Sequence, residues 1–309
     1  MARPDGPATR PDTRLVVAAA VGLVCLGLGA ELRGDRGESA SGEHRSGQQS
    51  GQYLLIDIPD RPHAAEAPPE GWCGENTIQQ ALLHHGGYVS QRAINRAGEP
   101  RHPDLYWGDL PKAMRAVGLT FETWSGSSRV SDRPQRYDDF VAWLESHLRQ
   151  GHPLITGVKL HPTQHPRWGL DHIVLVVGSE RDAGGHLGLD INTTWRSRVR
   201  RTRAELTSRQ GMSLHNRHGT FHAFAVTGLR RSGQPVRVTI RRESAETIEA
   251  TVSIEELRIG QKYRLERHEL GARRPVSTSE FIADATTHAV EVAIDPAGSA
   301  IWRCHPVTD

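Results

Sequence analysis

The chain has 309 residues, of which 37% are hydrophobic and 24% are charged, and this fits a folded globular protein with room for two domains. The formal net charge of +2 is too small to predict a nucleic-acid partner. Three cysteines are too few for a disulfide framework, and Cys304, in the last apolar run, is expected to be a buried core thiol.

The N-terminal region predicts an export signal. Arg3, Arg10 and Arg14 precede an uncharged apolar run, residues 15–30, that ends in small residues. The run is shorter than the roughly 20 residues that a membrane span needs. We therefore expect residues 1–30 to be a signal peptide and the mature protein to be secreted or to lie in the periplasm or cell envelope. A single-pass anchor is the alternative.

The next segment predicts a flexible linker. Residues 31–52 are rich in Gly, Ser, Gln and charge and contain almost nothing apolar. Such a composition cannot bury enough surface to fold. The folded part is expected to begin with the strand-like run 53–58.

Cys73 lies at the start of a segment with helical spacing. Ile78, Ala81 and Leu82 recur three or four residues apart, and the glycine pair 86–87 predicts the end of the helix. A thiol in the first turn of a helix feels the positive end of the helix dipole, which favours the nucleophilic thiolate. Cys73 is therefore the candidate nucleophile. The alternative is a buried, inert cysteine.

Later segments predict helices first and strands afterwards. Helices are expected at 90–98, 109–117 and 138–151, and strands at 154–160, 173–177, 187–191 and 221–226. This order favours an α+β domain over residues 53–229 with a mostly antiparallel sheet. From residue 235 to 309 short alternating runs predict a small fibronectin- or immunoglobulin-like β-sandwich as a second domain.

Thiol catalysis needs a base beside the sulfur and a third group that orients the base. His172 opens a predicted buried strand directly after a loop, which suits a base at a sheet edge. On the next strand Asp190 and Asn192 share one face, because side chains alternate. Either could accept the imidazole N–H. The order cysteine, histidine, then asparagine or aspartate fits a catalytic triad.

Several of these segments resemble papain-like cysteine peptidases. Residues 171–178 (DHIVLVVG) resemble the histidine strand of that superfamily, and residues 192–195 (NTTW) are similar to the Asn-Ser-Trp segment that follows it. Residues 73–87 and 151–158 (GHPLITGV) are closer to the bacteriocin-leader-processing branch, whose members cleave after double glycine.

The resemblance covers about residues 53–229 and implies a papain-like fold. It implies that Cys73 is the nucleophile, His172 the general base and acid, and Asn192 the orienting residue, with Asp190 as the substitute. It further implies a cysteine peptidase or amidohydrolase that needs no cofactor and acts on a peptide or protein substrate. A transglutaminase-like acyltransferase shares the same thiol–imidazole chemistry and is an alternative.

One position departs from the family pattern. Relatives carry a glutamine about six residues before the cysteine as an oxyanion donor, and this chain has Ala67 there. The backbone amide of Cys73 can supply one donor, and Gln52 is a candidate for the second. Loss of one donor costs about 100- to 1000-fold in rate. A catalytically silent relative that binds peptides or a surface partner is therefore the second hypothesis.

A few further residues are candidates for the substrate cleft, with ordinary packing as the alternative. They are Trp72, Gly74, Trp168, Asp171 and Trp195. His161, His165 and His172 are close in sequence but lack a complete ligand set, so no metal is expected. We expect a monomer whose second domain positions the enzyme or attaches it to the cell surface.

Overall fold

A computed structural model of the chain describes residues 53–69, 71–125, 134–160, 171–195, 198–207, 212–214, 221–230 and 233–308. All of them belong to one compact unit, Gln49–Asp309. Among these residues no helix is both long and apolar enough to cross a membrane. The predicted signal peptide, its anchor alternative, the linker and Trp168 lie outside the described residues.

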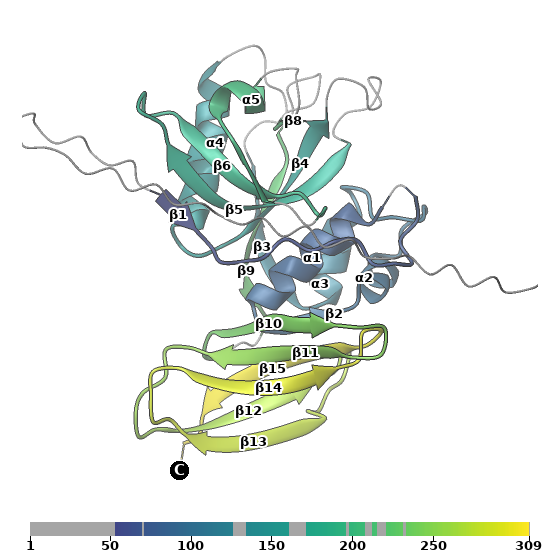
Figure 1. The fold of residues 1–309 in the computed structure, drawn as a ribbon, viewed down its shortest axis with the longest axis vertical. Coiled ribbons are helices and arrows are strands. Elements are labelled where there is room, and N and C mark those ends of the chain that lie inside the picture. Colours follow the sequence, from purple (N-terminus) through teal and green to yellow (C-terminus); the bar gives the residue numbers. More distant parts are fainter. Residues whose placement is uncertain are drawn as a thin grey trace, which may run out of the picture. The chain divides into compact units, whose positions relative to one another are not determined.

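The described part combines helices with antiparallel strands (Figure 1). The helices are α1 (Cys73–His84), α2 (Gln91–Gly98), α3 (Leu110–Ala116), α4 (Pro134–Leu148) and α5 (Arg203–Thr207). The strands are β1 (Tyr53–Leu55), β2 (Gly87–Val89), β3 (Leu119–Thr123), β4 (Leu154–Leu160), β5 (His172–Arg181), β6 (Leu187–Asn192), β7 (Arg198–Arg201), β8 (Met212–Ser213), β9 (Ala223–Leu229), β10 (Val236–Glu243), β11 (Ile248–Ile254), β12 (Lys262–His268), β13 (Ser277–Ile282), β14 (His288–Ile294) and β15 (Ser299–Pro306).

The largest sheet has eight strands in the order β3-β9-β4-β5-β6-β7, with β1 paired to β5 and β8 to β4. All of these pairs are antiparallel. The prediction of an α+β protein with a mostly antiparallel sheet is therefore confirmed. Strand β5 lies between β4 and β6 in this sheet, and its residues 173–177 are all buried. A strand that is buried on both faces needs apolar side chains throughout, which explains why this run carries no polar residue.

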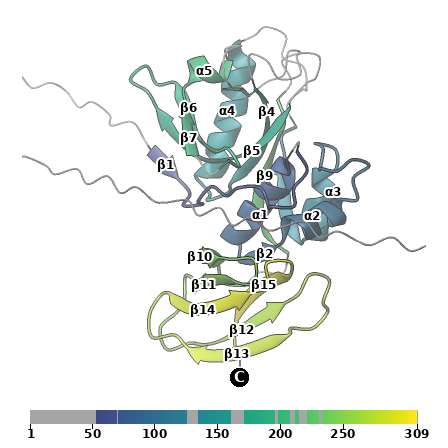
Figure 2. The same cartoon turned by 45° about the vertical axis from the view of Figure 1, so that its right-hand side comes forward.

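Two helices supply most of the apolar surface that covers this sheet. In α4, which lies largely within the helix expected at 138–151, one apolar stripe is buried: Phe140, Val141, Leu144 and Leu148 are each under 5% exposed. Helix α1 contributes Ile78, Ala81 and Leu82, each 0% exposed, to the same core. Figure 2 shows α4 running along the sheet of β4, β5 and β6, and both helices contact β5.

The remaining strands form two smaller sheets around a second core. One sheet has the order β10-β11-β14 and the other has the order β13-β12-β15-β2. Tyr263 is 1% exposed, and its hydroxyl accepts the N–H of Arg258 at 2.9 Å, which closes the turn before β12. Cys304 is 0% exposed in this core, so its prediction as a buried thiol is confirmed.

Strand β2 ties the first helix to the C-terminal strands. Helix α1 ends at His84, and Gly86 has a positive φ of 85°, as the glycine pair predicted. The chain then enters β2, which pairs with β15 so that Val89 lies opposite Ser299. The Tyr88 hydroxyl donates to the carbonyl of Pro296 at 2.7 Å. A segment directly after the cysteine helix therefore completes a C-terminal sheet.

Candidate active site

Cys73 is the first residue of α1, as its sequence position predicted. It is half-buried, and the backbone of Ile173, the residue that follows His172, lies close enough to the thiol to lower its pKa slightly. No side chain caps the start of the helix, because Trp72 at the N-cap position has no acceptor to offer. Its indole N–H donates to the carbonyl of Pro103 at 2.9 Å. The sulfur thus lies at the start of both α1 and β5.

His172 is held by a backbone carbonyl. It is the first residue of β5 and is 6% exposed. Its Nε2 lies 2.9 Å from the carbonyl oxygen of Thr193. A carbonyl can only accept, so Nε2 carries the proton and the neutral ring keeps a free electron pair on Nδ1. The ring of Trp195 stacks on the imidazole with centroids 4.4 Å apart and planes 10° apart.

Burial keeps both reactive groups neutral at pH 7. It raises the pKa of the Cys73 thiol to about 12, and the carboxylates of Glu75 and Asp104 add to the rise. Burial also lowers the pKa of His172 to about 4, against the contact with Thr193. A helix dipole contributes only about 0.3–1 kcal/mol, less than one pKa unit. The resting state is therefore a neutral thiol and a neutral imidazole, although the helix start was expected to favour the thiolate.

The structure does not bring Asn192 or Asp190 to the imidazole. Asn192 lies directly opposite Leu175 in the sheet, so both side chains project from one face. His172 is three residues before Leu175 and projects from the other face, because side chains alternate. Asp190 shares the face of Asn192. The expectation that either of them orients His172 is thus corrected by the register of β5 and β6.

Both residues have other partners among the described residues. The amide of Asn192 donates to the carbonyl of Ile58 and to Oε1 of Gln80, each at 2.8 Å, and its oxygen accepts from Arg198 at 3.0 Å. The carboxylate of Asp190 binds Arg200 at 2.9 Å. Asn192 therefore connects the end of β6 to Gln80 on α1 and to Ile58 in the segment before α1.

Asn192 was expected to be the partner of His172, whereas the structure shows the carbonyl of Thr193, one residue later. In the family's Asn-Ser-Trp segment the asparagine stands two residues before the tryptophan, and here that place belongs to Thr193, with Asn192 one residue further away. The spacing to Trp195 was a usable signal. A backbone carbonyl, however, leaves no signature in the residue type.

Asp60 fixes the segment that carries this carbonyl. Its Oδ1 accepts the N–H of Thr194 at 3.0 Å and the amide of Gln80 at 3.1 Å, and its Oδ2 accepts the hydroxyl of Thr193 at 3.4 Å. Thr194 has a positive φ of 67°, an uncommon backbone conformation for a β-branched residue. The carboxylate of Asp60 offsets that strain. Nothing in the sequence of the Asp60 loop singled this residue out.

The residues expected in a substrate cleft have different surroundings. Trp195 is 53% exposed over the imidazole, whereas Trp72 is 6% exposed and packed. A Cβ on Gly74 would lie 2.9 Å from Leu110, so the start of α1 packs too closely there for a larger residue. Asp171 accepts the N–H of Leu160 at 2.8 Å and forms a buried ion pair with Lys159. Of these four, Trp195 alone exposes a large surface beside His172.

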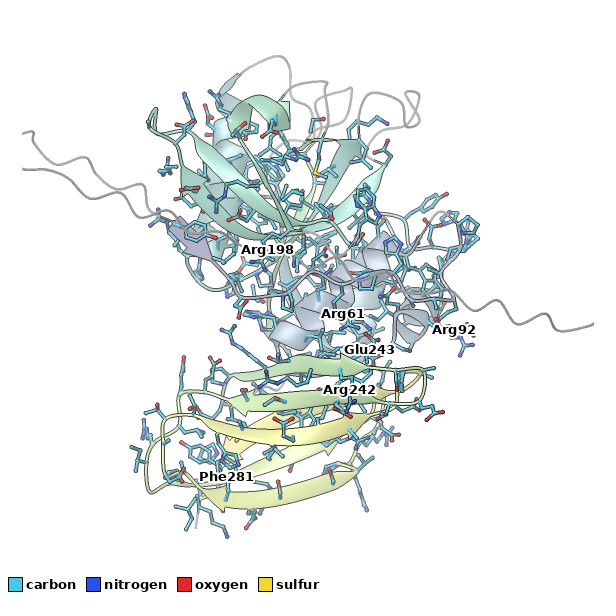
Figure 3. All side chains as sticks on the ribbon, viewed as in Figure 1. Arg61, Arg92, Arg198, Arg242, Glu243 and Phe281 are labelled. Carbon is cyan, nitrogen blue, oxygen red and sulfur yellow. The ribbon has the colours of Figure 1, made fainter. Side chains whose placement is uncertain are left out.

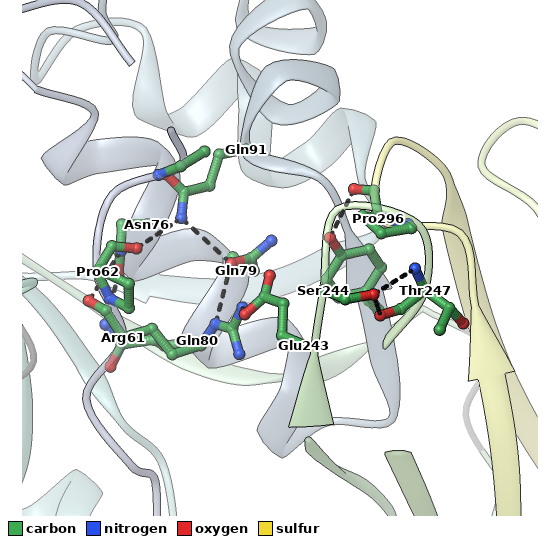
Figure 4. A network of polar contacts seen from close by, with 12 residues as sticks. Arg61, Pro62, Asn76, Gln79, Gln80, Gln91, Glu243, Ser244, Thr247 and Pro296 are labelled. Atoms are coloured by element: carbon green, nitrogen blue, oxygen red, sulfur yellow. Dashed lines mark hydrogen bonds and ion pairs between the residues drawn. The ribbon is translucent and has the colours of Figure 1, made fainter. Parts of the chain in front are cut away.

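A polar network continues from the Asp60 loop along α1. Arg61 donates to Oε1 of Gln79 at 3.2 Å and pairs with Glu243 at 2.9 Å, while Asn76 donates to the carbonyl of Pro62 at 2.5 Å (Figure 4). Figure 3 labels Arg61 beside α1 and Glu243 on β10. A cavity of about 450 Å³ between this loop and β10 contains neither Cys73 nor His172 in its lining.

Comparison of the sequence with known proteins does not place the chain in a family. No family model matches it, and no curated protein matches it. Among the described residues no group of three or more His, Cys, Asp or Glu side chains could hold a metal ion. His161 and His165 lie outside those residues.

Proposed function

We propose that the chain is a cysteine-type hydrolase that cleaves a peptide or amide bond. One observation carries the proposal: Cys73, at the start of α1, lies close to the backbone of Ile173, and the preceding residue, His172, has its ring held in one tautomer by the carbonyl of Thr193. Nucleophilic catalysis needs a thiol and a histidine that keeps a free ring nitrogen to take the thiol proton. The papain-like resemblance of residues 53–229 supports the same reading.

The proposed reaction begins from the neutral pair. As sulfur attacks the carbonyl carbon, the thiol proton moves to Nδ1 of His172, and the imidazolium is stabilised through its Nε2–H to Thr193. The same proton then passes from Nδ1 to the leaving amine, which leaves a thioester on Cys73. Water then gives a proton to His172 and attacks the thioester carbon. The carbon–sulfur bond breaks, the acid product leaves, and His172 returns the proton to the Cys73 sulfur.

The direct test uses the full-length protein, fluorescently labelled casein and the ester p-nitrophenyl acetate. Cys73→Ala should abolish peptide release and the burst of nitrophenol. Cys304→Ala is the matched control, because it removes the second thiol of the described residues without touching the site. Equal activity of the Cys73→Ala variant and the wild type would refute the hydrolase proposal.

A second candidate is a catalytically silent relative that binds peptides. The specific observation in its favour is the burial of both reactive groups, which opposes their charged forms. It predicts no burst from the wild type, together with binding of peptides that contact Trp195. Transfer of casein acyl groups to a labelled amine, in preference to water, would instead indicate a transglutaminase-like acyltransferase.

The rest of the chain is assigned on the same basis. We propose that residues 1–30 direct export to the periplasm, cell envelope or medium and that residues 31–52 are a linker. We also propose that residues 235–309 form a β-sandwich that positions the hydrolase or attaches it to a surface, with the protein acting as a monomer. Detection of the intact N-terminus in the mature protein would contradict the export proposal.

A further inference from the structure

His63 packs against Gly71, two residues before the proposed nucleophile, and no role was predicted for it. Its ring lies against Gly71, which has a positive φ of 85°. A Cβ on Gly71 would be 2.3 Å from Cε1 and 2.4 Å from Nδ1 of His63, so the ring fills the space that a side chain would take. Two residues span at most about 7 Å, so this ring edge faces the backbone close to Cys73.

The other side of the ring is fixed. Nε2 of His63 lies 3.0 Å from the hydroxyl of Thr194, whose own N–H is bound to Asp60. When the Thr194 hydroxyl donates to Nε2, the proton of the neutral ring resides on Nδ1. His63 also lies close enough to His172 to influence its charge. The two rings therefore lie near each other, one on the segment that follows Asp60 and the other at the start of β5.

We propose that His63 donates its Nδ1–H to the oxyanion formed in the reaction, in place of the glutamine that relatives carry at the position of Ala67. The inference rests on the proposed hydrolase function. In the step concerned, sulfur bonds to the carbonyl carbon, the thiol proton passes to His172, and the carbonyl π electrons move to oxygen. The resulting oxyanion accepts hydrogen bonds from the Cys73 backbone amide and from His63. Its collapse restores the carbonyl and expels the leaving group.

Two supporting features follow from the surroundings of the ring. Burial lowers the pKa of His63, against the neighbouring Asp60, so the ring is neutral at pH 7 and has one N–H to give. The ring also lies against Gly71, so its Nδ1 edge is close to the backbone that leads into Cys73. Gly71 donates to the carbonyl of Pro68 at 2.8 Å.

The test compares two reactions of Cys73 in the full-length protein. Acylation by p-nitrophenyl acetate passes through an oxyanion, whereas alkylation by iodoacetamide does not. His63→Ala should slow acylation about 100-fold and leave alkylation within about twofold of the wild type. His63→Gln, which restores an amide donor, should recover most of the acylation rate. Thr194→Val should slow acylation less than His63→Ala, because it frees the tautomer without removing the ring.

Three outcomes would overturn the inference. Wild-type acylation by His63→Ala would show that the ring gives no hydrogen bond to the oxyanion. A parallel loss of acylation and alkylation would show that His63 acts on the sulfur or on the fold. Absence of a Cys73-dependent burst in the wild type would remove the proposed hydrolase itself. If His63→Ala fails to fold, His63→Phe fills the same space without an N–H to donate and should slow acylation alone.

Discussion

The carbonyl oxygen of Thr193 accepts the Nε2–H of His172 at 2.9 Å, so a main-chain atom holds the ring where a side chain was expected. A backbone acceptor survives any substitution that keeps the local conformation. The position of His172 therefore depends on the residues that hold the backbone at Thr193, such as Asp60.

Asn192→Ala should reduce stability more than it changes the chemistry. The substitution leaves Oε1 of Gln80 without its donor in a buried site, which costs about 1–3 kcal/mol. The measurement is the free energy of unfolding in urea, with the pH profile of the Cys73 alkylation rate beside it. A pH profile altered in the still-folded variant would mean that Asn192 orients His172 after all.

Asp60→Asn should lower the acylation rate while His172 and Cys73 remain in place. The neutral amide weakens the hydrogen bond from the N–H of Thr194, and bonds to charged acceptors contribute about 1.5–3 kcal/mol. The Thr193 carbonyl then loses its fixed position. The rate is measured with p-nitrophenyl acetate, and Asp57→Asn, on the same loop, serves as the matched control. Equal rates for both variants would separate Asp60 from the orientation of His172.

Unfolding by acid should begin in the range where unfolded histidines gain protons. Burial lowers the pKa of His172 to about 4 and of His85 to about 3, from an ordinary value of 6.5. Between pH 6.5 and these values the unfolded state binds more protons, so stability falls as pH falls, by about 1.4 kcal/mol per pH unit per histidine. His85→Gln should reduce the slope measured by urea unfolding from pH 7 to 4. His186→Gln, at an exposed residue, should leave it unchanged.

Glu75 should make the stability of the fold depend on pH in the opposite direction from the histidines. Burial raises its pKa to about 7, and its Oε2 has no partner among the described residues. The folded state therefore binds the extra proton between pH 4.5 and 7, and stability falls as pH rises through that range. Glu75→Gln should be more stable than the wild type at pH 8, and its Cys73 should alkylate faster. A variant that is less stable at pH 8 would show that the charge of Glu75 is stabilised elsewhere.

The buried elements could be predicted from the sequence because burial shapes the residue pattern. The run 154–160 matches β4, and the run 187–191 lies within β6, since each strand is lined by buried side chains. Strand β13 was missed, because five of its six residues are exposed and no apolar alternation marks it. Strand β2 was missed because three residues are too short for a period.

The site could be predicted only where side chains define it. Cys73 and His172 have the positions expected from helix and strand patterns. The choice of Asn192 failed because one additional residue before Trp195 reverses the face from which a side chain projects. Asp60 and His63 lie in a loop with several prolines, and their roles depend on how that loop folds back against Gly71 and Thr194.

The pairing of β2 with β15 has a consequence for biosynthesis. Val89 leaves the ribosome long before Ser299, its partner in the sheet. Strand β2 therefore remains unpaired until almost the whole polypeptide has been translated. Truncations that end near residue 230 would retain Cys73 and His172 but leave this exposed edge open to association between molecules.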